Sequence, residues 1–230
     1  QGRLEEAIEV YHKALSVNPN SAATYNNIGI ILHRQGKLKE AQSAYENSLL
    51  FKPDYAEAYN NMGNTLQDQG KLDEAIEAYE KALTLKPNNF KAFNNLGNAL
   101  KTLSKPEEAI EAYEKAISLK PDYADAFNNM GNLQKNRGNL EEAIAAFNNT
   151  LSIEPDHPEA FESLQALLTQ LVHSCDKYTA SSQNFDKQEF SGILSKPLYQ
   201  IQNAIKNILE MNFQQAQTNL HQFRALKGEA

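Results

Sequence analysis

Residues 56–89 of this chain read AEAYNNMGNTLQDQGKLDEAIEAYEKALTLKPNN, with one apolar stripe before Gly70 and another after it. The apolar residues are Tyr59, Met62 and Leu66 in the first half and Leu72, Ala75, Ile76, Tyr79, Ala82 and Leu83 in the second. Their spacings of three and four residues place each set on one face of a helix. Pro87 ends the second helix because it has no N–H and its ring clashes with the preceding turn. The stretch therefore predicts a helical hairpin, with Gly70 as a left-handed residue in its turn.

The same pattern recurs along the chain every 34 residues. The positions that keep this period include Pro19, Pro53, Pro87, Pro121 and Pro155, Gly29, Gly63, Gly97 and Gly131, and Ala41, Ala75, Ala109 and Ala143. A fixed period in this range is typical of structural repeats that stack on one another. Such stacks offer long exposed surfaces and few buried pockets, so we expect the chain to bind a partner and not to catalyse a reaction.

These residues resemble the tetratricopeptide repeat, whose pattern is an aromatic, a Leu-Gly pair, an Ala, a second aromatic, another Ala and a closing Pro. One copy carries the pattern at Phe93, Leu96, Gly97, Ala109, Tyr113, Ala116 and Pro121. The resemblance implies an all-α solenoid, a right-handed superhelix of antiparallel hairpins whose first helices line the concave side. Ser48 and Thr150 depart from it by replacing a packing alanine, and Ser104 replaces a turn glycine.

The repeats divide the chain into three parts. Residues 1–21 supply the second helix of a truncated repeat, residues 22–157 hold four complete repeats, and residues 158–230 form a divergent helical cap. Within the cap we expect a first helix, then a polar loop with a short helix over 174–192. Two further helices are expected from Pro197 to about Phe223, where Ala216 takes the place of a repeat alanine.

The composition excludes some classes of partner. The chain has 230 residues and a formal net charge of -7, which argues against nucleic acid and against a polybasic membrane contact. No apolar run is long enough to span a bilayer. The chain begins with Gln1 inside an expected repeat, so we interpret it as a fragment. A single Cys175 leaves the compartment undetermined, with a soluble protein of the cytoplasm favoured.

Asparagines recur in pairs in the first half of each repeat. The pairs are Asn26-Asn27, Asn60-Asn61, Asn94-Asn95 and Asn128-Asn129, followed three positions later by Asn64, Asn98 and Asn132. In the first complete copy Ile30 takes that later position. Asparagine is a mediocre helix former, so several in each helix call for an explanation. Asn61, Asn64 and Asp68 share a face distinct from the packing face, and in this fold that face borders the groove.

Two interpretations of the asparagines stay open. A row of carboxamides can pair with the main chain of an extended peptide, and Asn27, Asn61, Asn95 and Asn129 resemble the asparagine ladder of O-linked N-acetylglucosamine transferase. Alternatively, the asparagines bond within or between repeats, or simply reflect duplication. The candidate peptide-binding residues are Asn27, Asn61, Asn64, Asn95, Asn98, Asn129, Asn132, Lys91, Lys101 and Lys135.

The charges near this row exclude one known binding mode. A carboxylate clamp, as in co-chaperones that bind chaperone tails, needs lysines and an arginine among the asparagines. Here Asn60 and Asn94 stand where a lysine is wanted, so the clamp's charge-assisted bonds are missing. The cations Lys91, Lys101, Lys135 and Arg137 make the C-terminal end of the row more basic, which could favour an acidic peptide or reflect ordinary solvated residues.

The sequence contains few residues that could form a catalytic or metal site. His173, Cys175 and Asp176 form the one cluster of catalytic or metal-binding residue types, and three such residues without a second cluster make a weak site. The chain has no P-loop, no GxGxxG and no nucleophile elbow. We therefore expect no catalytic residues, no metal and no cofactor.

The sequence thus predicts a non-catalytic scaffold that binds a protein or an extended peptide in its groove. One alternative is the substrate-recruiting arm of a larger glycosyl- or sulfotransferase. A third interpretation is self-association through the terminal repeat, where Ala7, Ile8 and Leu15 lack a partner helix. On the first hypothesis, replacing Asn61, Asn95 and Asn129 with alanine should leave helicity intact and weaken peptide binding.

Overall fold

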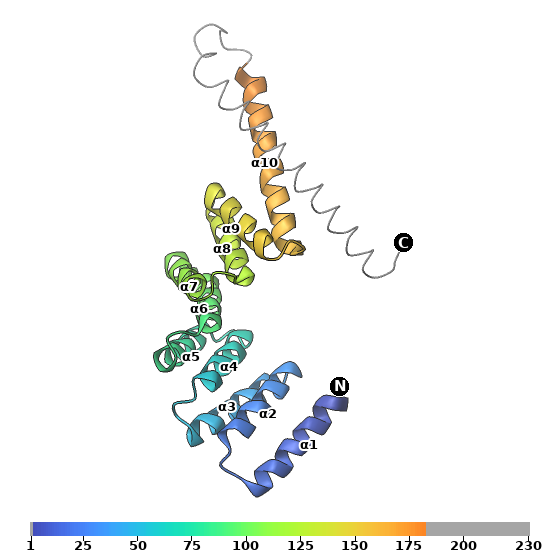
Figure 1. Ribbon diagram of the computed structural model, residues 1–230, viewed down its shortest axis with the longest axis vertical. Coiled ribbons are helices and arrows are strands. Elements are labelled where there is room, and N and C mark those ends of the chain that lie inside the picture. The colour runs from blue at the N-terminus through green and yellow to red at the C-terminus, as the bar shows by residue number, and fades with distance from the viewer. Residues whose placement is uncertain (1, 183–230) are drawn as a thin grey trace. The chain divides into compact units, whose positions relative to one another are not determined.

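A computed structural model describes residues 2–182, and the side chains of residues 4–170 (Figure 1). Within this part every regular element is an α-helix. The helices are α1 (Gly2–Val17), α2 (Ala22–Arg34), α3 (Leu38–Phe51), α4 (Ala56–Asp68), α5 (Leu72–Leu85), α6 (Phe90–Thr102), α7 (Pro106–Leu119), α8 (Ala124–Arg137), α9 (Leu140–Ile153) and α10 (Pro158–Ser182). The chain divides into two compact units between Leu133 and Gln134, and each is described by itself.

The hairpin predicted for residues 56–89 is present as α4 and α5. Gly70 has a φ of 77° in the turn, where its N–H donates to Gln67 O at 2.9 Å. The N–H of Lys71 donates to Leu66 O at 2.9 Å, so two carbonyls at the end of α4 are satisfied. Gly36 and Gly138 repeat this left-handed turn with φ values of 74° and 80°.

Ser104 holds the same left-handed position in the turn between α6 and α7, with a φ of 58°. A side chain there crowds the following carbonyl oxygen, a strain that glycine avoids. Pro106 stands at the start of α7, where a missing N–H removes no helical bond. The departure seen in the sequence is therefore a strained residue at an otherwise unchanged turn.

Each hairpin closes around a buried aromatic ring. Tyr79 is fully buried and lies against Gly63, where an added Cβ would sit 2.6 Å from the ring atom Cε1. The same distance separates Gly97 from Tyr113. The glycine thus lets the two helices approach until the ring fills the space between them, which explains why both residues recur together.

Two hydroxyl groups take the place of methyl groups in this core. Ser48 and Thr150 are both fully buried where other repeats have alanine. The Ser48 hydroxyl donates to Ala22 O at 2.8 Å, and the Thr150 hydroxyl donates to Ala146 O at 3.1 Å. Because each buried donor has an acceptor, these departures from the repeat pattern carry no unsatisfied polar group.

In the first unit the hairpins stack in chain order, which confirms the predicted all-α solenoid. Each second helix packs on the next first helix, as α3 does on α4 and α5 does on α6. The backbones of neighbouring first helices also approach closely, α2 with α4 and α4 with α6. The described part of the unit has no such backbone approach between α3 and α5 or between α5 and α7. The first helices are therefore closer together and lie on the inner side of the curve.

In the second unit α10 packs on α9. Ala160, Leu164, Leu167 and Leu168 of α10 are buried against Phe147. The sequence predicted a polar loop with a short helix from Ser174, whereas residues 174–182 continue the first helix without a break. The reason is that no glycine or proline interrupts the sequence between Pro158 and Gly192, and a polar composition alone does not end a helix.

The remaining predictions about the C-terminal region fall outside the described residues. These are the rest of the 174–192 loop, the two helices between Pro197 and Phe223, and the role of Ala216. The division into residues 1–21, 22–157 and 158–230 likewise stays a prediction.

Candidate functional site

The predicted asparagines of the first unit lie along its first helices. We call this surface the first-helix face, defined by Asn27 on α2, Asn61 and Asn64 on α4, Lys91, Asn95, Asn98, Lys101 and Thr102 on α6, and Asn129 and Asn132 on α8. All of these are half-buried except Lys91 and Thr102, which are exposed. The face is therefore open to solvent but consists largely of amides packed close together.

The amides of successive repeats are joined by hydrogen bonds. The second asparagine of one pair donates from Nδ2 to Oδ1 of the first asparagine in the preceding pair. Asn61 donates to Asn26 at 3.1 Å, and Asn129 donates to Asn94 at 3.0 Å. The acceptors are buried, with 1% of Asn26 and 5% of Asn94 exposed. The asparagine pairs therefore connect the repeats, as the packing interpretation of the sequence predicted.

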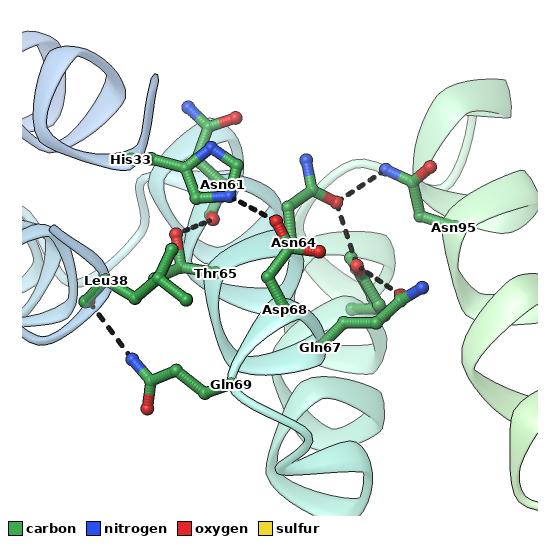
Figure 2. Close-up of polar contacts among 10 residues, drawn as sticks. His33, Leu38, Asn61, Asn64, Thr65, Gln67, Asp68, Gln69 and Asn95 are labelled. Carbon is green, nitrogen blue, oxygen red and sulfur yellow. Dashed lines mark hydrogen bonds and ion pairs between the residues drawn. The ribbon is translucent and has the colours of Figure 1, made fainter. Parts of the chain in front are cut away.

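Asn95 contacts two asparagines of the preceding repeat through one nitrogen. Its Nδ2 lies 3.4 Å from Asn60 Oδ1. The same nitrogen lies 2.9 Å from Asn64 Oδ1 (Figure 2). Both acceptors belong to α4, one turn apart, so a single carboxamide of α6 links two residues of the neighbouring first helix. Replacing such an asparagine with alanine would remove bonds between repeats, so the triple alanine variant would lower stability as well as change the surface.

Buried tyrosine hydroxyls donate hydrogen bonds to the asparagine side chains of the first-helix face. Tyr79 Oη lies 2.8 Å from Asn64 Oδ1 and 3.0 Å from Gln67 Oε1, and Tyr113 Oη donates to Asn98 Oδ1 at 2.8 Å. Burial raises the pKa of Tyr79 and of Tyr113 above the usual value, and Asp68 raises that of Tyr79 further. Both hydroxyls therefore remain protonated donors.

The sequence left bonding between repeats open as one interpretation, but the particular bonds and the tyrosine donors were not predicted. Asn64 and Tyr79 are fifteen residues apart, as are Asn98 and Tyr113. The bonded asparagines are 35 residues apart, one more than the repeat period. The 35-residue offset joins unlike members of two asparagine pairs, and the 15-residue offset joins two helices of one hairpin. A comparison of equivalent positions at the 34-residue period tests neither.

One charged contact crosses the same surface. His33 Nε2 on α2 lies 2.8 Å from Asp68 Oδ2 on α4. Figure 2 shows the two side chains reaching toward one another beside Asn61. Because 28% of the histidine and 57% of the aspartate side chain are exposed, the contact is a surface interaction of modest energy.

The three predicted lysines differ in their surroundings. Lys91 at the start of α6 is exposed, and Lys101 in its last turn is half-buried. Lys135 belongs to the second unit, where its Nζ donates to Ser163 Oγ at 3.1 Å and lies 5.8 Å from the centre of the Phe147 ring. In the first unit, the predicted site therefore consists of the asparagines with Lys91 and Lys101.

The structure offers no support for a metal site in the part that it describes, where no three His, Cys, Asp or Glu residues lie close enough to hold an ion. His173, Cys175 and Asp176 fall in the last turns of α10, beyond the described side chains. Among the described helices, none has an apolar stretch that could cross a bilayer.

Comparison with protein families agrees with this geometry. Models described as Tetratricopeptide repeat match residues 20–88, 54–122 and 102–168, and a model described as TPR repeat matches residues 1–36. The chain belongs to the tetratricopeptide repeat proteins. The match to these models confirms the predicted family, although it does not test the likeness to the asparagine ladder. No curated protein matches the chain.

Solved structures of other tetratricopeptide repeat proteins resemble the chain. A structure of MamA is 28% identical with a TM-score of 0.62, and the match covers 67% of this chain and 90% of MamA. YrrB, described as a TPR protein with an unusual peptide-binding site, is 23% identical with a TM-score of 0.59 and coverages of 91% and 99%. PilF of Pseudomonas aeruginosa is 22% identical with a TM-score of 0.65 and coverages of 75% and 84%.

Proposed function

We propose that this tetratricopeptide repeat chain is a non-catalytic scaffold that binds an extended segment of another protein along the first-helix face. The observation that supports this most is that the asparagines keep bonding capacity after they have joined the repeats. Asn61 uses one N–H of its amide for Asn26, which leaves a second N–H and the carbonyl oxygen. The side chain is half-buried, so these atoms can reach a partner.

An extended peptide suits such a surface because its main chain offers N–H and C=O groups along its edge. Carboxamides can pair with both kinds of group whatever side chains the peptide carries. The likeness to the asparagine ladder of O-linked N-acetylglucosamine transferase is part of this proposal, with Asn27, Asn61, Asn95 and Asn129 in the matching positions. Asn64, Asn98 and Asn132 extend the same surface.

Charge adds a preference to this proposal. Lys91 and Lys101 lie near the two ends of α6, and an acidic side chain on the bound segment could pair with either of them. Lys135, on the second unit, keeps its proposed role only if it can leave Ser163. YrrB, with its peptide-binding site, is too distant in sequence to show more than the fold, so the proposal rests on the residues of this chain.

The alternatives have less support. No feature of the described residues favours the recruiting arm of a larger transferase. Self-association keeps one supporting observation, the exposure of Val10 (62%) and Val17 (86%) on α1. Ile8 and Leu15 pack on the core of the next hairpin and are only partly open. Light scattering over a range of concentrations would reveal such association as a rise in mass.

A pair of matched threonines provides the test. Thr102 on the first-helix face and Thr84 on a second helix are both exposed, and each hydroxyl donates at 2.9 Å to the carbonyl four residues earlier. Arginine at either position would lose the same local bond and add the same bulk. We expect wild type to bind members of a randomised peptide array, Thr102→Arg to lose that binding, and Thr84→Arg to keep it.

The two variants should have the same helicity, so circular dichroism serves as the folding control. Equal loss of binding in both variants would place the bound segment elsewhere. Absence of binding by the wild-type protein to every peptide of the array would end the proposal.

A further inference from the structure

We propose that the hydrogen bonds behind the first-helix face fix which atom each amide presents. Asn64 then offers a donor and Asn95 an acceptor, so that this part of the face recognises the C=O and N–H groups of a bound main chain separately. The inference rests on the proposed function, because it specifies how the same face would read an extended peptide.

Two donors reach the carbonyl oxygen of Asn64 inside the protein. It lies 2.8 Å from the hydroxyl of Tyr79 and 2.9 Å from the Nδ2 of Asn95, and an amide oxygen has two lone pairs. The single hydrogen of the Tyr79 hydroxyl also has Gln67 Oε1 within reach at 3.0 Å, and we assign it to Asn64 because that contact is the shorter one. Its Nδ2 group donates to no acceptor in the part of the chain that the structure describes. Asn64 can therefore give a partner two N–H groups but no acceptor.

Asn95 has the opposite pattern. Its two N–H groups point to Asn60 Oδ1 and Asn64 Oδ1, while its own Oδ1 accepts no hydrogen bond from the described residues. In Figure 2 the nitrogen of Asn64 and the oxygen of Asn95 both point away from their bonded neighbours. The two side chains thus present a donor and an acceptor next to one another.

Tyr79 acts as the positioning residue for this arrangement. Its ring is fully buried against Gly63, which places its hydroxyl oxygen beside Asn64 Oδ1. If the Asn64 amide alone turned over, its N–H groups would face the N–H groups of Asn95. If both amides turned over, Asn95 Oδ1 would face Asn60 Oδ1. The internal bonds therefore select one orientation of both amides.

This polarity predicts a property of the ligand. A residue whose N–H pairs with Asn95 cannot be proline, because proline has no N–H. Side chains are not read at this point, so the partner class is an extended segment with an unmodified, proline-free main chain over Asn64 and Asn95. A carbonyl of the same segment accepts from Asn64.

Aspartate variants separate the two roles. Asn64→Asp keeps an oxygen for Tyr79 and for Asn95 but removes the exposed donor. Asn95→Asp keeps the exposed acceptor and removes both internal donors. The probe is the tightest uncharged, end-blocked peptide from the array, titrated at high salt so that the added charge has little long-range effect.

We expect Asn64→Asp to melt close to wild type and to bind this peptide about 3- to 10-fold more weakly, the usual range for one hydrogen bond. Asn95→Asp should instead have a lower melting temperature. Tyr79→Phe leaves the N–H groups of Asn64 in place and removes one of the two bonds that orient them, so it should weaken binding less than Asn64→Asp does. It should weaken binding no further in the double variant, where the donor is already absent.

Ester analogues of the peptide test the acceptor. Replacing one main-chain N–H at a time by oxygen should weaken binding at the residue that meets Asn95, as should proline there. If all esters and Asn64→Asp bind like their parents while Thr102→Arg still abolishes binding, the inference is wrong and the proposed function stands. If the wild-type protein binds no array peptide, both are wrong.

Discussion

At the scale of single residues, the contact between Gly63 and Tyr79 limits the size of the side chain at position 63. A Cβ there would meet the ring at 2.6 Å, and the ring is fully buried, so it can move aside only by displacing other core residues. We predict that Gly63→Ala lowers the free energy of unfolding by about 1–3 kcal/mol, even though alanine is the better helix former. Urea unfolding measures this, and an unchanged or higher midpoint would show that the helices separate without cost.

At Ser104, in contrast, a substitution should raise the free energy of unfolding. Because its φ of 58° suits glycine, Ser104→Gly should raise the free energy of unfolding by about 1 kcal/mol. The control is Ser43→Gly, at an exposed position inside α3, which should lower it by about 0.5 kcal/mol. The account of the turn fails if both substitutions shift the urea midpoint in the same direction.

At the scale of the helices, the asparagine pairs join one first helix to the next. Asn26 is buried and accepts from Asn61, whereas its neighbour Asn27 is half-buried. We predict that Asn26→Ala lowers the free energy of unfolding by about 1–3 kcal/mol, because Asn61 loses its acceptor and a packed side chain is removed. Asn27→Ala, the matched control, should change it by less than about 0.5 kcal/mol. Similar losses in both variants would contradict a bond between repeats.

Most of the helical pattern could be predicted from the sequence, for reasons that single residues show. The break at Gly70 and the stop at Pro87 depend on local backbone chemistry, which the sequence carries directly. A comparison of the copies identified Ser104 as the residue that replaces a turn glycine, and its positive φ was found in the structure. The continuation of α10 past Ser174 was harder to predict, because residues 174–182 are polar and lack the apolar period that identifies the other helices.

The site was predictable only in part. Its asparagines could be identified as a row, because their period matches that of the hairpins. The orientation of their amides could not, because it depends on bonds such as Asn95 to Asn64 and Tyr79 to Asn64, which the packing of two helices creates. Which atoms remain for a partner is therefore a property of the stack.

At the scale of the whole molecule, buried tyrosines should make stability depend on alkaline pH. Burial raises the pKa of Tyr45, Tyr79 and Tyr113, so the folded protein keeps protons that the unfolded chain releases above a pH of about 10. Stability is thus unaffected by these groups below that pH and falls above it, by about 1.4 kcal/mol per pH unit for each tyrosine. Tyrosinate absorbance should rise together with the loss of helicity, and Tyr79→Phe should show a shallower decline. Ionisation of these hydroxyls while the helices persist would contradict their burial.

The most direct test of the account is a nuclear magnetic resonance titration that follows the side-chain amide groups of asparagine as the array peptide is added. The account predicts that the NH₂ signals of Asn61 and Asn64 shift with the peptide, because these groups lie on the first-helix face. Asn47 serves as the internal control, since its amide donates to Ser43 O on a second helix and should stay in place. Shifts at Asn47 without shifts at Asn61 and Asn64 would contradict the account.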